Sequence, residues 1–305
     1  MSTKNPKNVA ASVRGRLLHL AKERGDDFQL VLTRYANERL LYRLSVSEHA
    51  ERFVLKGATL FTLWGGEPHR ATRDVDLLGF GDPSQANLQS VFLEALEQPV
   101  VEDGIEFELD ALVTGPIRED QSYGGVRIVV PARITSAQVR LQIDVGFGDA
   151  ITPRPEEAEL PALLDFPAPQ LRVYPRETVV AEKAEAIVQL GLLNSRMKDF
   201  FDLLKLSQMF EFDGALLLQA MKATFERRGT PLPVEVPVGL TSTFAGDAAK
   251  QKQWTAFVRK AAAANVGDLA SVTDAVSRFV WPPLEAAGAQ TTFGGMWRPK
   301  SASWS

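Results

Sequence analysis

Hydrophobic residues near the start of the chain recur at helical spacing. In Val13–Leu20 and Leu30–Leu44 the apolar positions fall three or four apart, which predicts two helices. Phe53–Leu55 is a short apolar run before a glycine, and Ala58–Trp64 returns to helical spacing and ends at two glycines. The pattern therefore predicts two helices, a strand and a third helix, in that order.

The middle of the chain alternates apolar and polar residues, as half-buried strands do. After a predicted strand over Asp74–Phe80 and a helix over Gln85–Leu96, the alternation recurs in Ile105–Ala111, Val126–Ile134 and Val139–Val145. Several strands with few helices between them do not fit a regular doubly wound parallel sheet. We therefore expect a mixed or antiparallel sheet with flanking helices.

A proline-rich segment separates this part from a helical one. Five prolines fall within Thr152–Pro169, which we interpret as a linker or domain boundary. The helices predicted beyond it are Glu177–Leu193, Ser195–Phe210, Gly214–Arg227, Ala248–Ala264 and Leu269–Ala286. The expected fold class is α+β, with a mixed-sheet domain over residues 1–165, a mainly α-helical domain over residues 166–305, and a loosely ordered tail after Gly288.

Composition narrows the classes of protein. A length of 305 residues, with 45% hydrophobic and 24% charged, fits two packed globular domains. The absence of cysteine excludes disulfides, thiolate zinc sites and a cysteine nucleophile, and three histidines argue against a histidine-rich metal site. The chain lacks a signal-like start and any apolar run of about 18 residues, so we expect a cytoplasmic protein without a membrane segment.

Charge is unevenly distributed along the chain. The net charge of -4 argues against a uniformly basic surface for nucleic acid. Residues 1–52 nevertheless hold ten Lys and Arg against six acids, a local net of +4. Two interpretations stay open for these residues: solvated faces of helices, or a local contact with a phosphate backbone.

Three aspartates are candidate metal ligands. Asp74 and Asp76 stand two positions apart in a predicted strand, so both point from one face, although two exposed acids near a strand end give the same pattern. Asp144 projects from the polar face of another predicted strand, where a solvent-facing residue is the simpler interpretation. Carboxylates that meet on neighbouring strands suit Mg²⁺ or Mn²⁺. We predict that all three hold metal and that Asp144 helps to deprotonate an attacking hydroxyl.

The segment Lys56-Gly57-Ala58-Thr59 joins a predicted strand to a predicted helix. Backbone N–H groups at such a junction can receive a triphosphate. We therefore predict that Lys56, Gly57, Ala58 and Thr59 bind the nucleotide, the alternative being a turn that simply needs a glycine.

The first helices after the proline-rich segment carry a second group of candidates. Lys183 lies beside the apolar stripe of its helix and either extends to solvent or neutralises a phosphate. Further on, Lys198 and Asp202 have the spacing of an i,i+4 ion pair. The alternative is a basic residue that reaches a phosphate and an acid that orients it. We predict that Lys183 and Asp199 are catalytic and that Arg196, Lys198 and Asp202 bind nucleotide.

These segments together resemble the AbiEii/MenT family of nucleotidyltransferase toxins from bacterial abortive-infection and toxin–antitoxin systems. The resemblance lies in the order and spacing of several short motifs. They are Phe53–Leu60, Arg70–Leu77 with its Asp-Val-Asp, Ile143–Val145, Glu182–Ala186 and Arg196–Leu203. The last part of the chain adds no motif of this kind.

The resemblance implies a nucleotidyltransferase sheet followed by a mainly helical domain. It implies a nucleoside triphosphate and Mg²⁺, a cognate antitoxin protein and, as in several relatives, transfer of nucleotides to tRNA 3′ ends. It also places metal on Asp74 and Asp76, phosphate on Lys183 and a required acid at Asp199.

Two further positions matter in the light of this resemblance. Family members often carry Gly or Ser where Ala58 stands, which bears on nucleotide preference. Thr72 occupies a hydroxyl position just before the first carboxylate, and the resemblance implies control by phosphorylation there. The added negative charge would compete with the triphosphate.

The reaction expected from these features is in-line attack of an acceptor hydroxyl on the α-phosphorus, in a cleft to which both domains contribute. The protein would supply position and charge. The N-terminal helices, with any exposed face of Lys250, Lys252, Arg259 and Lys260, are a candidate surface for RNA phosphates. Two alternatives stay open. One is transfer to a protein or small-molecule hydroxyl, which the acidic net charge favours, and the other is a non-catalytic module that binds a nucleotide or a partner.

Overall fold

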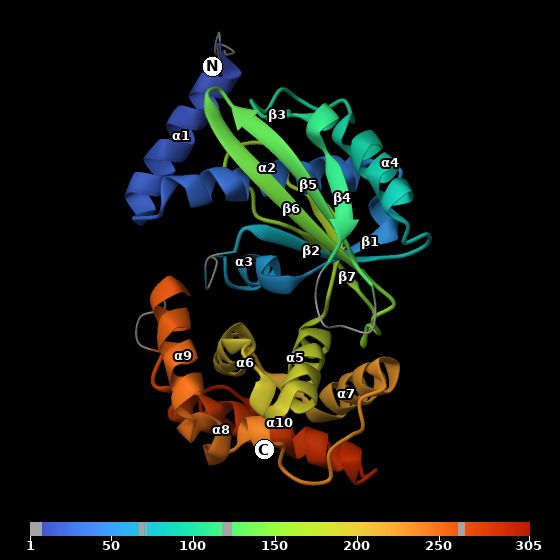
Figure 1. Cartoon of the computed structure of the whole chain (residues 1–305), viewed down its shortest axis with the longest axis vertical. Coiled ribbons are helices and arrows are strands. Elements are labelled where there is room, and N and C mark those ends of the chain that lie inside the picture. Colours follow the sequence, from blue (N-terminus) through green and yellow to red (C-terminus); the bar gives the residue numbers. More distant parts are fainter. Residues whose placement is uncertain (1–7, 67–69, 71, 118–123, 262–265) are drawn as a thin grey trace. The chain divides into compact units, whose positions relative to one another are not determined.

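The computed structural model describes residues 8–66, 70, 72–117, 124–261 and 266–305. The chain divides into two compact units. Unit 1 comprises Met1–Gly148 and Glu156–Val173, and unit 2 comprises Asp149–Pro155 and Tyr174–Ser305. A mixed sheet with flanking helices forms unit 1, and helices dominate unit 2 (Figure 1). The predicted α+β fold class is confirmed.

Unit 1 combines long N-terminal helices with the strands of the sheet. Its helices are α1 Val9–Arg24, α2 Phe28–Val46, α3 Leu60–Gly65 and α4 Gln85–Leu96, with 3-10 turns η1 Ala50–Arg52, η2 Gly57–Thr59 and η3 Leu109–Ala111. Its strands are β1 Phe53–Lys56, β2 Asp74–Gly79, β3 Glu106–Phe107, β4 Val113–Pro116, β5 Val126–Ile134, β6 Ala137–Phe147, β7 Glu156–Glu159 and β8 Gln170–Val173. Asp27 caps α2 and Ser84 caps α4, because each side chain accepts a hydrogen bond from a first-turn N–H.

The strands of unit 1 form one mixed sheet in the order β3-β5-β6-β2-β1-β8-β7, and β4 also pairs with β5. β5 and β6 form an antiparallel hairpin, β2 runs parallel to β6, and β1 runs antiparallel to β2. The hairpin turn is tight: Ile134 pairs with Ala137, and Thr135 between them has a φ of 57°. A turn of this kind fixes the register of both strands.

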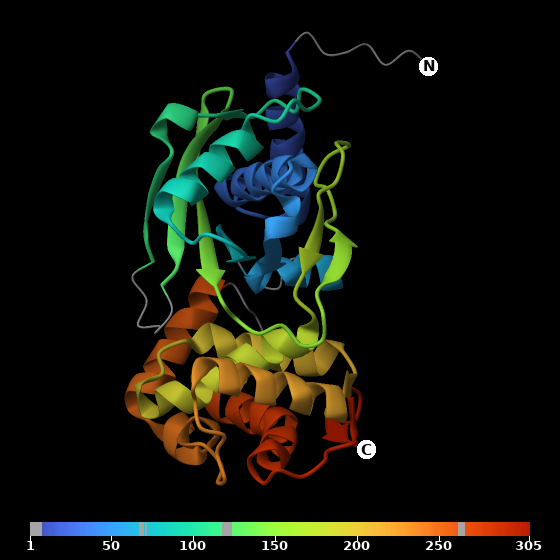
Figure 2. The same ribbon diagram turned by 90° about the vertical axis from the view of Figure 1, so that its right-hand side faces the viewer.

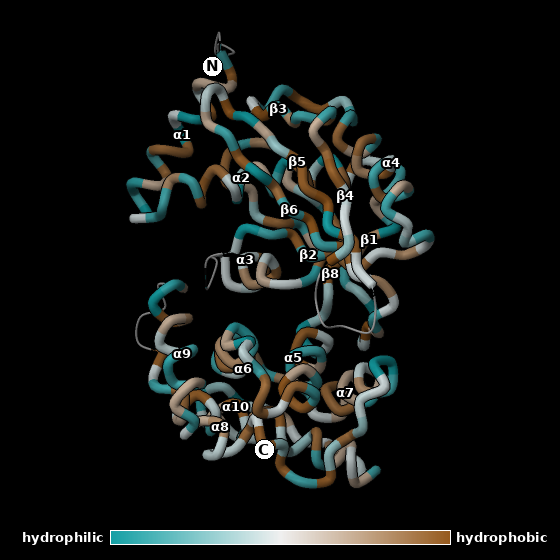
Figure 3. Tube along the Cα trace, in the orientation of Figure 1, coloured by the Kyte–Doolittle hydropathy of each residue, from teal (hydrophilic) through white to brown (hydrophobic). Residues whose placement is uncertain are grey.

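Alternation along β6 gives the sheet a buried face and an outer face. Its odd-numbered residues from Val139 to Val145 are buried, and the residues between them are less so. Figure 3 colours this strand, with the rest of the chain, by hydropathy. α2 packs against β6 and against α4, which in turn contacts β4 and β5 (Figure 2). The helices bury the apolar face, and Asp144 projects from the other face, as its sequence pattern predicts.

Buried charges hold the loop between β7 and β8 against α2. Arg39 pairs with Glu38 at 2.7 Å and donates a hydrogen bond to the carbonyl oxygen of Pro167 at 2.8 Å. Glu38 also accepts one from the backbone N–H of Leu163 at 2.7 Å. Buried charges are tolerated when such partners satisfy them. The segment Thr152–Pro169 therefore contains a strand and an anchored loop.

Short strands account for the differences from the predicted sheet. The sequence predicts one strand over Ile105–Ala111, but β3 ends at Phe107 and the chain then turns in η3. β4, β7 and β8 are absent from the prediction. β4 ends in Gly-Pro and β7 is Glu-Glu-Ala-Glu, residues that disfavour strands. Pairing with β5 and β8 stabilises them where local preference does not.

Unit 2 is built from helices on both sides of a long loop. They are α5 Arg176–Leu190, α6 Met197–Met209, α7 Gly214–Arg228, α8 Ser242–Gly246, α9 Ala248–Ala261 and α10 Leu269–Gly288, with turns η4 Gly191–Leu193 and η5 Val238–Leu240. The predicted end of the α9 helix at Ala264 lies outside the described residues. Among the helices that the structure describes, none is long and apolar enough to cross a membrane.

The C-terminal tail is ordered, so the prediction of a loose tail is wrong. β9 Phe212–Asp213, β10 Met296–Arg298 and β11 Ser303–Trp304 form a small sheet in the order β11-β10-β9. Trp297 is 1% exposed, and its indole N–H donates a hydrogen bond to the carbonyl oxygen of Ser207 at 2.7 Å. Its ring packs on Phe279. Burial of aromatic side chains therefore fixes the tail despite its polar composition.

Candidate active site

Four charged side chains lie in one row across the sheet of unit 1. Lys56 on β1 faces Asp76 on β2. Asp76 faces Asp144 on β6, and Asp144 faces Arg127 on β5. Directly opposed residues project from the same face of a sheet, and Asp74 lies two positions before Asp76 on that face. The structure therefore places the three predicted carboxylates on one face of two adjacent strands.

Asp76 lies against the turn that begins at Gly57. A β-carbon at position 57 would overlap the carboxylate of Asp76, and Gly57 has a φ of 78°. Both the close approach and the positive φ require glycine. The sequence leaves open whether this glycine is merely a turn, and the structure shows that the neighbouring acid also depends on it.

Asp144 is held in a bidentate ion pair with Arg127. Nε and Nη2 of Arg127 donate to Oδ1 and Oδ2 of Asp144 at 2.8 and 2.7 Å. Gln142 flanks the pair: with its amide oxygen turned toward Arg127, that oxygen accepts from Nη2 and Nε at 3.1 and 3.2 Å. Paired charge-assisted hydrogen bonds of this geometry are strong. Both carboxylate oxygens of Asp144 are thus engaged by one guanidinium.

The entry to β2 is anchored from α2. Asn37 donates a hydrogen bond from its side-chain amide to the carbonyl oxygen of Arg73 at 3.0 Å. The hydroxyl of Thr72 lies 3.5 Å from the carbonyl oxygen of Asp74. Asp74 itself is exposed and Thr72 is half-buried. A phosphate on Thr72 would therefore add its charge beside Asp74, and phosphorylation of Thr72 stays a prediction.

The residues of the predicted nucleotide-binding turn differ in the groups that they can offer to a nucleotide. The ammonium of Lys56 lies 4.0 Å from a β-carbon built on Gly146, so Lys56 extends over β6. The side chain of Ala58 is buried, which leaves only its backbone for a nucleotide. Thr59 is half-buried. Ala58, where family members often carry Gly or Ser, thus has its side chain packed inside unit 1.

Asp74 and the two acids of the row suit a divalent metal ion. Asp74 and Asp76 project from the same face and offer the hard oxygen donors that Mg²⁺ and Mn²⁺ prefer. The missing side chain at Gly57 leaves room for the carboxylate of Asp76. Asp144 can join them only with an oxygen that Arg127 shares or releases. The residues present therefore fit a metal held chiefly by Asp74 and Asp76.

In unit 2, two buried acids of α6 enclose Lys183 of α5. The ammonium lies 2.9 Å from Oδ1 of Asp199 and 2.8 Å from Oδ2 of Asp202. Arg196 donates from Nε to the other oxygen of Asp199 at 2.7 Å. Lys183 therefore does not extend to solvent, and Asp202 pairs with it, whereas Lys198 is exposed. This replaces the Lys198–Asp202 pair considered from the sequence.

The charges of this cluster keep Asp199 ionised. Burial raises the pKa of Asp199, but the charges of Lys183 and Arg196 and the hydrogen bond from Lys183 outweigh burial and hold the pKa below its usual value. Asp199 and Asp202 are 0% and 1% exposed. Two acids buried to this degree position the cations beside them, and Lys183 and Arg196 are the members nearer to solvent.

The structure narrows the candidate RNA surface. Four N-terminal arginines pair with carboxylates inside unit 1: Arg16 with Asp165, Arg34 with Asp26, Arg39 with Glu38 and Arg43 with Asp103. Paired charges have less to offer to RNA phosphates. Lys250 is 8% exposed and lies over the ring of Phe244, whereas Lys252, Arg259 and Lys260 are exposed on α9. Lys4 and Lys7 lie outside the described residues.

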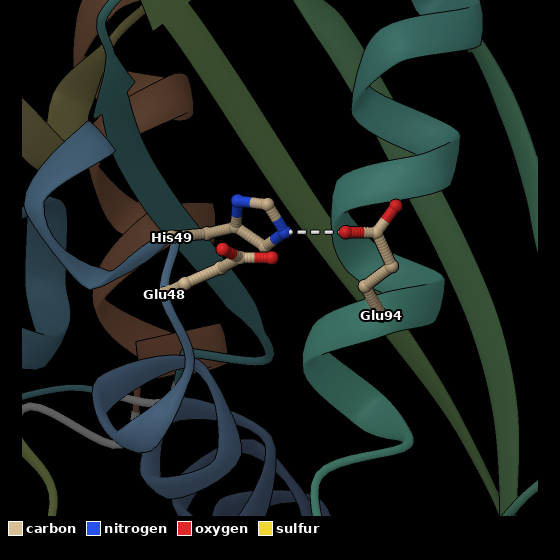
Figure 4. A group of neighbouring side chains, drawn as sticks. All are labelled: Glu48, His49 and Glu94. Carbon is tan, nitrogen blue, oxygen red and sulfur yellow. Dashed lines mark hydrogen bonds and ion pairs between the residues drawn. The ribbon is translucent and has the colours of Figure 1, made fainter.

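Another group with metal-type side chains lies at the opposite end of β1 from Lys56. Nε2 of His49 lies 2.8 Å from Oε2 of Glu94 (Figure 4). The other oxygen of Glu94 accepts a hydrogen bond from Ser90 at 2.7 Å. Glu48 stands beside them, and the donor atoms of Glu48, His49 and Glu94 lie within 4.8 Å of one another. Hydrogen bonds from Ser90 and His49 lower the pKa of Glu94. We interpret the group as a hydrogen-bonded contact of His49 that ties the segment after α2 to α4.

Arg127 is the site residue that the sequence predictions omit, although a signal for it exists. The strands Val126–Ile134 and Val139–Val145 are both predicted, and a two-residue turn at Thr135-Ser136 pairs Ile134 with Ala137. Counting back from that turn places Arg127 opposite Asp144. Asn37 has no such signal, because its contact joins a helix to a distant loop.

A known protein family matches most of the chain. The family described as Nucleotidyl transferase AbiEii toxin, Type IV TA system, matches residues 39–274, which confirms the resemblance drawn from the sequence. No match is found among curated proteins.

Solved structures from Helicobacter pylori are also similar. JHP933 has a TM-score of 0.47 and 17% identity, with 84% of this chain and 91% of that chain covered. A provisionally assigned nucleotidyltransferase has a TM-score of 0.44 and 16% identity, with 83% and 90% covered. Neither similarity is close enough to assign an activity.

Proposed function

Because this chain belongs to the AbiEii family of nucleotidyltransferase toxins of type IV toxin–antitoxin systems, we propose that it transfers a nucleotide to an acceptor hydroxyl. Its substrates are a nucleoside triphosphate and, as acceptor, a tRNA 3′ end, and the reaction depends on Mg²⁺. The observation that carries the proposal is the placement of Asp74, Asp76 and Asp144 on one face of β2 and β6, with Asp76 against Gly57.

Asp74 and Asp76 hold the divalent ion in this proposal. When bound, the ion offsets phosphate charge and stabilises the leaving pyrophosphate. Lys56 adds positive charge at one end of the row, and the backbone of the turn from Gly57 to Thr59 is positioned by the same glycine that accommodates Asp76. The protein thus contributes orientation and electrostatic stabilisation.

The proposed step forms one bond and breaks another at the α-phosphorus. The acceptor hydroxyl oxygen bonds to that phosphorus, and the bond to the bridging oxygen of pyrophosphate breaks, so pyrophosphate leaves with the electron pair. The hydroxyl proton passes to a carboxylate of the row. Asp144 accepts the proton once Arg127 has released one of the two carboxylate oxygens of Asp144.

The charged cluster of unit 2 has a supporting role in this proposal. Lys183 and Arg196 neutralise phosphate charge, and Asp199 and Asp202 hold them in place. The outcome that supports this role is a rise in the KM for the triphosphate, without a matching fall in kcat, when Lys183 is replaced by arginine, which retains the charge but not the geometry.

The exposed basic residues of α9 favour RNA as the acceptor. Lys252, Arg259 and Lys260 are exposed on this helix, and clustered cations bind phosphate backbones. The net charge of -4 instead favours a protein or small-molecule acceptor.

The family match supports an antitoxin partner, with Thr72 as the proposed site of phosphorylation.

Direct transfer of label tests the proposal. The purified chain is incubated with Mg²⁺, each α-labelled triphosphate, and either total tRNA or total protein, with Asp76→Asn as the inactive comparison. We expect label in RNA from the wild type and none from the variant. Label in protein would instead identify a protein, and not tRNA, as the acceptor. If no pool is labelled and Asp76→Asn leaves cellular toxicity intact, the enzymatic proposal fails.

A further inference from the structure

Arg127 places a cation at one end of the row, beside the candidate metal ligand Asp144. Lys56 and Arg127 are the basic residues at the two ends of the row that contains Asp76 and Asp144. Arg127 takes both oxygens of Asp144, while Lys56 stands opposite Asp76. We propose that Arg127 is a positioning residue that keeps Asp144 from the metal ion until a nucleoside triphosphate binds and draws the guanidinium onto its phosphates.

The ion pair competes with metal at Asp144 for two reasons. The guanidinium occupies both oxygens at 2.8 and 2.7 Å, so a metal ion must share or displace a strong hydrogen bond. Its positive charge, held at Asp144, also disfavours a divalent cation on Asp74 and Asp76 of β2, the strand that adjoins β6. In the absence of nucleotide, metal binding therefore rests on Asp74 and Asp76.

The triphosphate is a suitable partner for the released side chain. A guanidinium binds phosphate with the same planar pair of N–H groups that it offers to a carboxylate, and a triphosphate carries more negative charge than one aspartate. The side chain of Arg127 is 38% exposed, against 15% for Asp144. The cation is thus the more accessible member of the pair, and Gln142 lies beside its guanidinium.

This inference rests on the proposed function, because it takes a nucleoside triphosphate as the ligand. Its test measures binding by the full chain. Mn²⁺ affinity is measured by the loss of the free-ion EPR signal, and nucleotide affinity by calorimetry with α,β-methylene triphosphates in Mg²⁺. The variants are Arg127→Gln, Asp76→Asn and a matched control, Arg133→Gln. Arg133 lies on the same strand and face and also pairs with carboxylates, Glu106 and Glu108.

We expect Arg127→Gln to change the two affinities in opposite directions. Mn²⁺ should bind about tenfold more tightly without nucleotide, because a repelling charge is removed. The triphosphate analogue should bind about tenfold more weakly, because a phosphate partner is lost. Arg133→Gln should change neither. A residue that only stabilised the sheet would weaken both affinities together, and that result would overturn the inference.

The outcomes also separate this inference from the proposed function. If Asp76→Asn abolishes Mn²⁺ binding but Arg127→Gln leaves it unchanged, Arg127 has no role at the metal and the proposed function stands. If Asp76→Asn leaves Mn²⁺ binding intact, the metal site itself is wrong. Equal unfolding temperatures for Arg127→Gln and Arg133→Gln establish that a change in affinity does not come from misfolding.

Discussion

The carboxylate of Asp76 occupies the space that a β-carbon of residue 57 would take. Asp76 can therefore keep its position only if residue 57 has no side chain. Gly57→Ala should therefore displace Asp76. It should also strain the backbone, because residue 57 has a φ of 78°, at a cost of about 1–2 kcal/mol in the free energy of unfolding. We expect at least a tenfold loss of Mn²⁺ affinity, measured by calorimetry.

Gly66→Ala is the matched control for this substitution. Gly66 has a φ of 77°, and a β-carbon there meets no atom of the described residues within 4 Å. The same backbone strain is thus introduced without a neighbour to displace. We expect Gly66→Ala to lower the unfolding temperature by a similar amount and to leave metal affinity unchanged. Equal metal affinities for the two variants would show that Asp76 does not depend on the space at Gly57.

The buried acid Asp199 should make folding sensitive to acid. Its pKa is lowered in the folded protein, because Lys183 and Arg196 outweigh the effect of burial. A lowered folded pKa stabilises the protein above the ordinary aspartate pKa of about 3.9, and this contribution is lost as pH falls through the folded pKa. Thermal unfolding from pH 6 to pH 3 should show a falling midpoint in the wild type.

Asp199→Asn tests the source of that pH dependence. The variant should unfold at a lower temperature at pH 7, with a loss of about 3–5 kcal/mol, because Lys183 and Arg196 lose a buried partner. Its midpoint should fall less steeply toward pH 3. Parallel midpoint curves for the two proteins would assign the acid sensitivity to other groups.

The ordered tail predicts a stabilising role for Trp297. Trp297→Ala removes a ring that packs on Phe279 and leaves the carbonyl oxygen of Ser207 without its indole donor. We expect a loss of about 3–5 kcal/mol in the free energy of unfolding, measured by urea titration. Arg298→Ala removes only an exposed ion pair with Glu211 and should cost less than about 1 kcal/mol. Equal losses would contradict the packing role.

The basic face of α9 predicts a measurable effect of salt. If RNA phosphates bind there, replacing Lys252, Arg259 and Lys260 by alanine should weaken RNA binding and reduce the slope of log affinity against log salt by about 2. Fluorescence anisotropy over a salt series provides the measurement. Arg278→Ala on α10 is the control, since that arginine is also exposed. An unchanged slope in the triple variant would move the RNA surface elsewhere.

Local pattern predicts the parts of the site that depend on strand periodicity. Asp74, Asp76 and Asp144 are assigned to polar faces because apolar neighbours alternate with them. Their adjacency depends on β2 running parallel to β6, a pairing between segments far apart in sequence. The resemblance to a family, rather than any spacing in the chain, supplies that step.

Tertiary contacts override local preference elsewhere. The acidic run Glu156–Glu159 becomes β7 through pairing with β8, and the polar tail is ordered by Trp297. Lys183 of α5 pairs with Asp199 and Asp202 of α6, although Lys198 is closer to Asp202 in sequence. Sequence spacing reveals which pairs are able to meet, but burial decides which do.

Arg127 lies opposite Asp144 on a single hairpin, so a substitution of either residue changes the surroundings of the other. Loss of the arginine alone removes the positive charge at Asp144, and loss of the aspartate alone removes the carboxylate that holds the guanidinium of Arg127. A one-residue insertion in the turn at Thr135 would turn Arg127 toward the apolar face of the sheet. Substitutions at either position, and changes in the length of that turn, should therefore be tolerated mainly when they occur together.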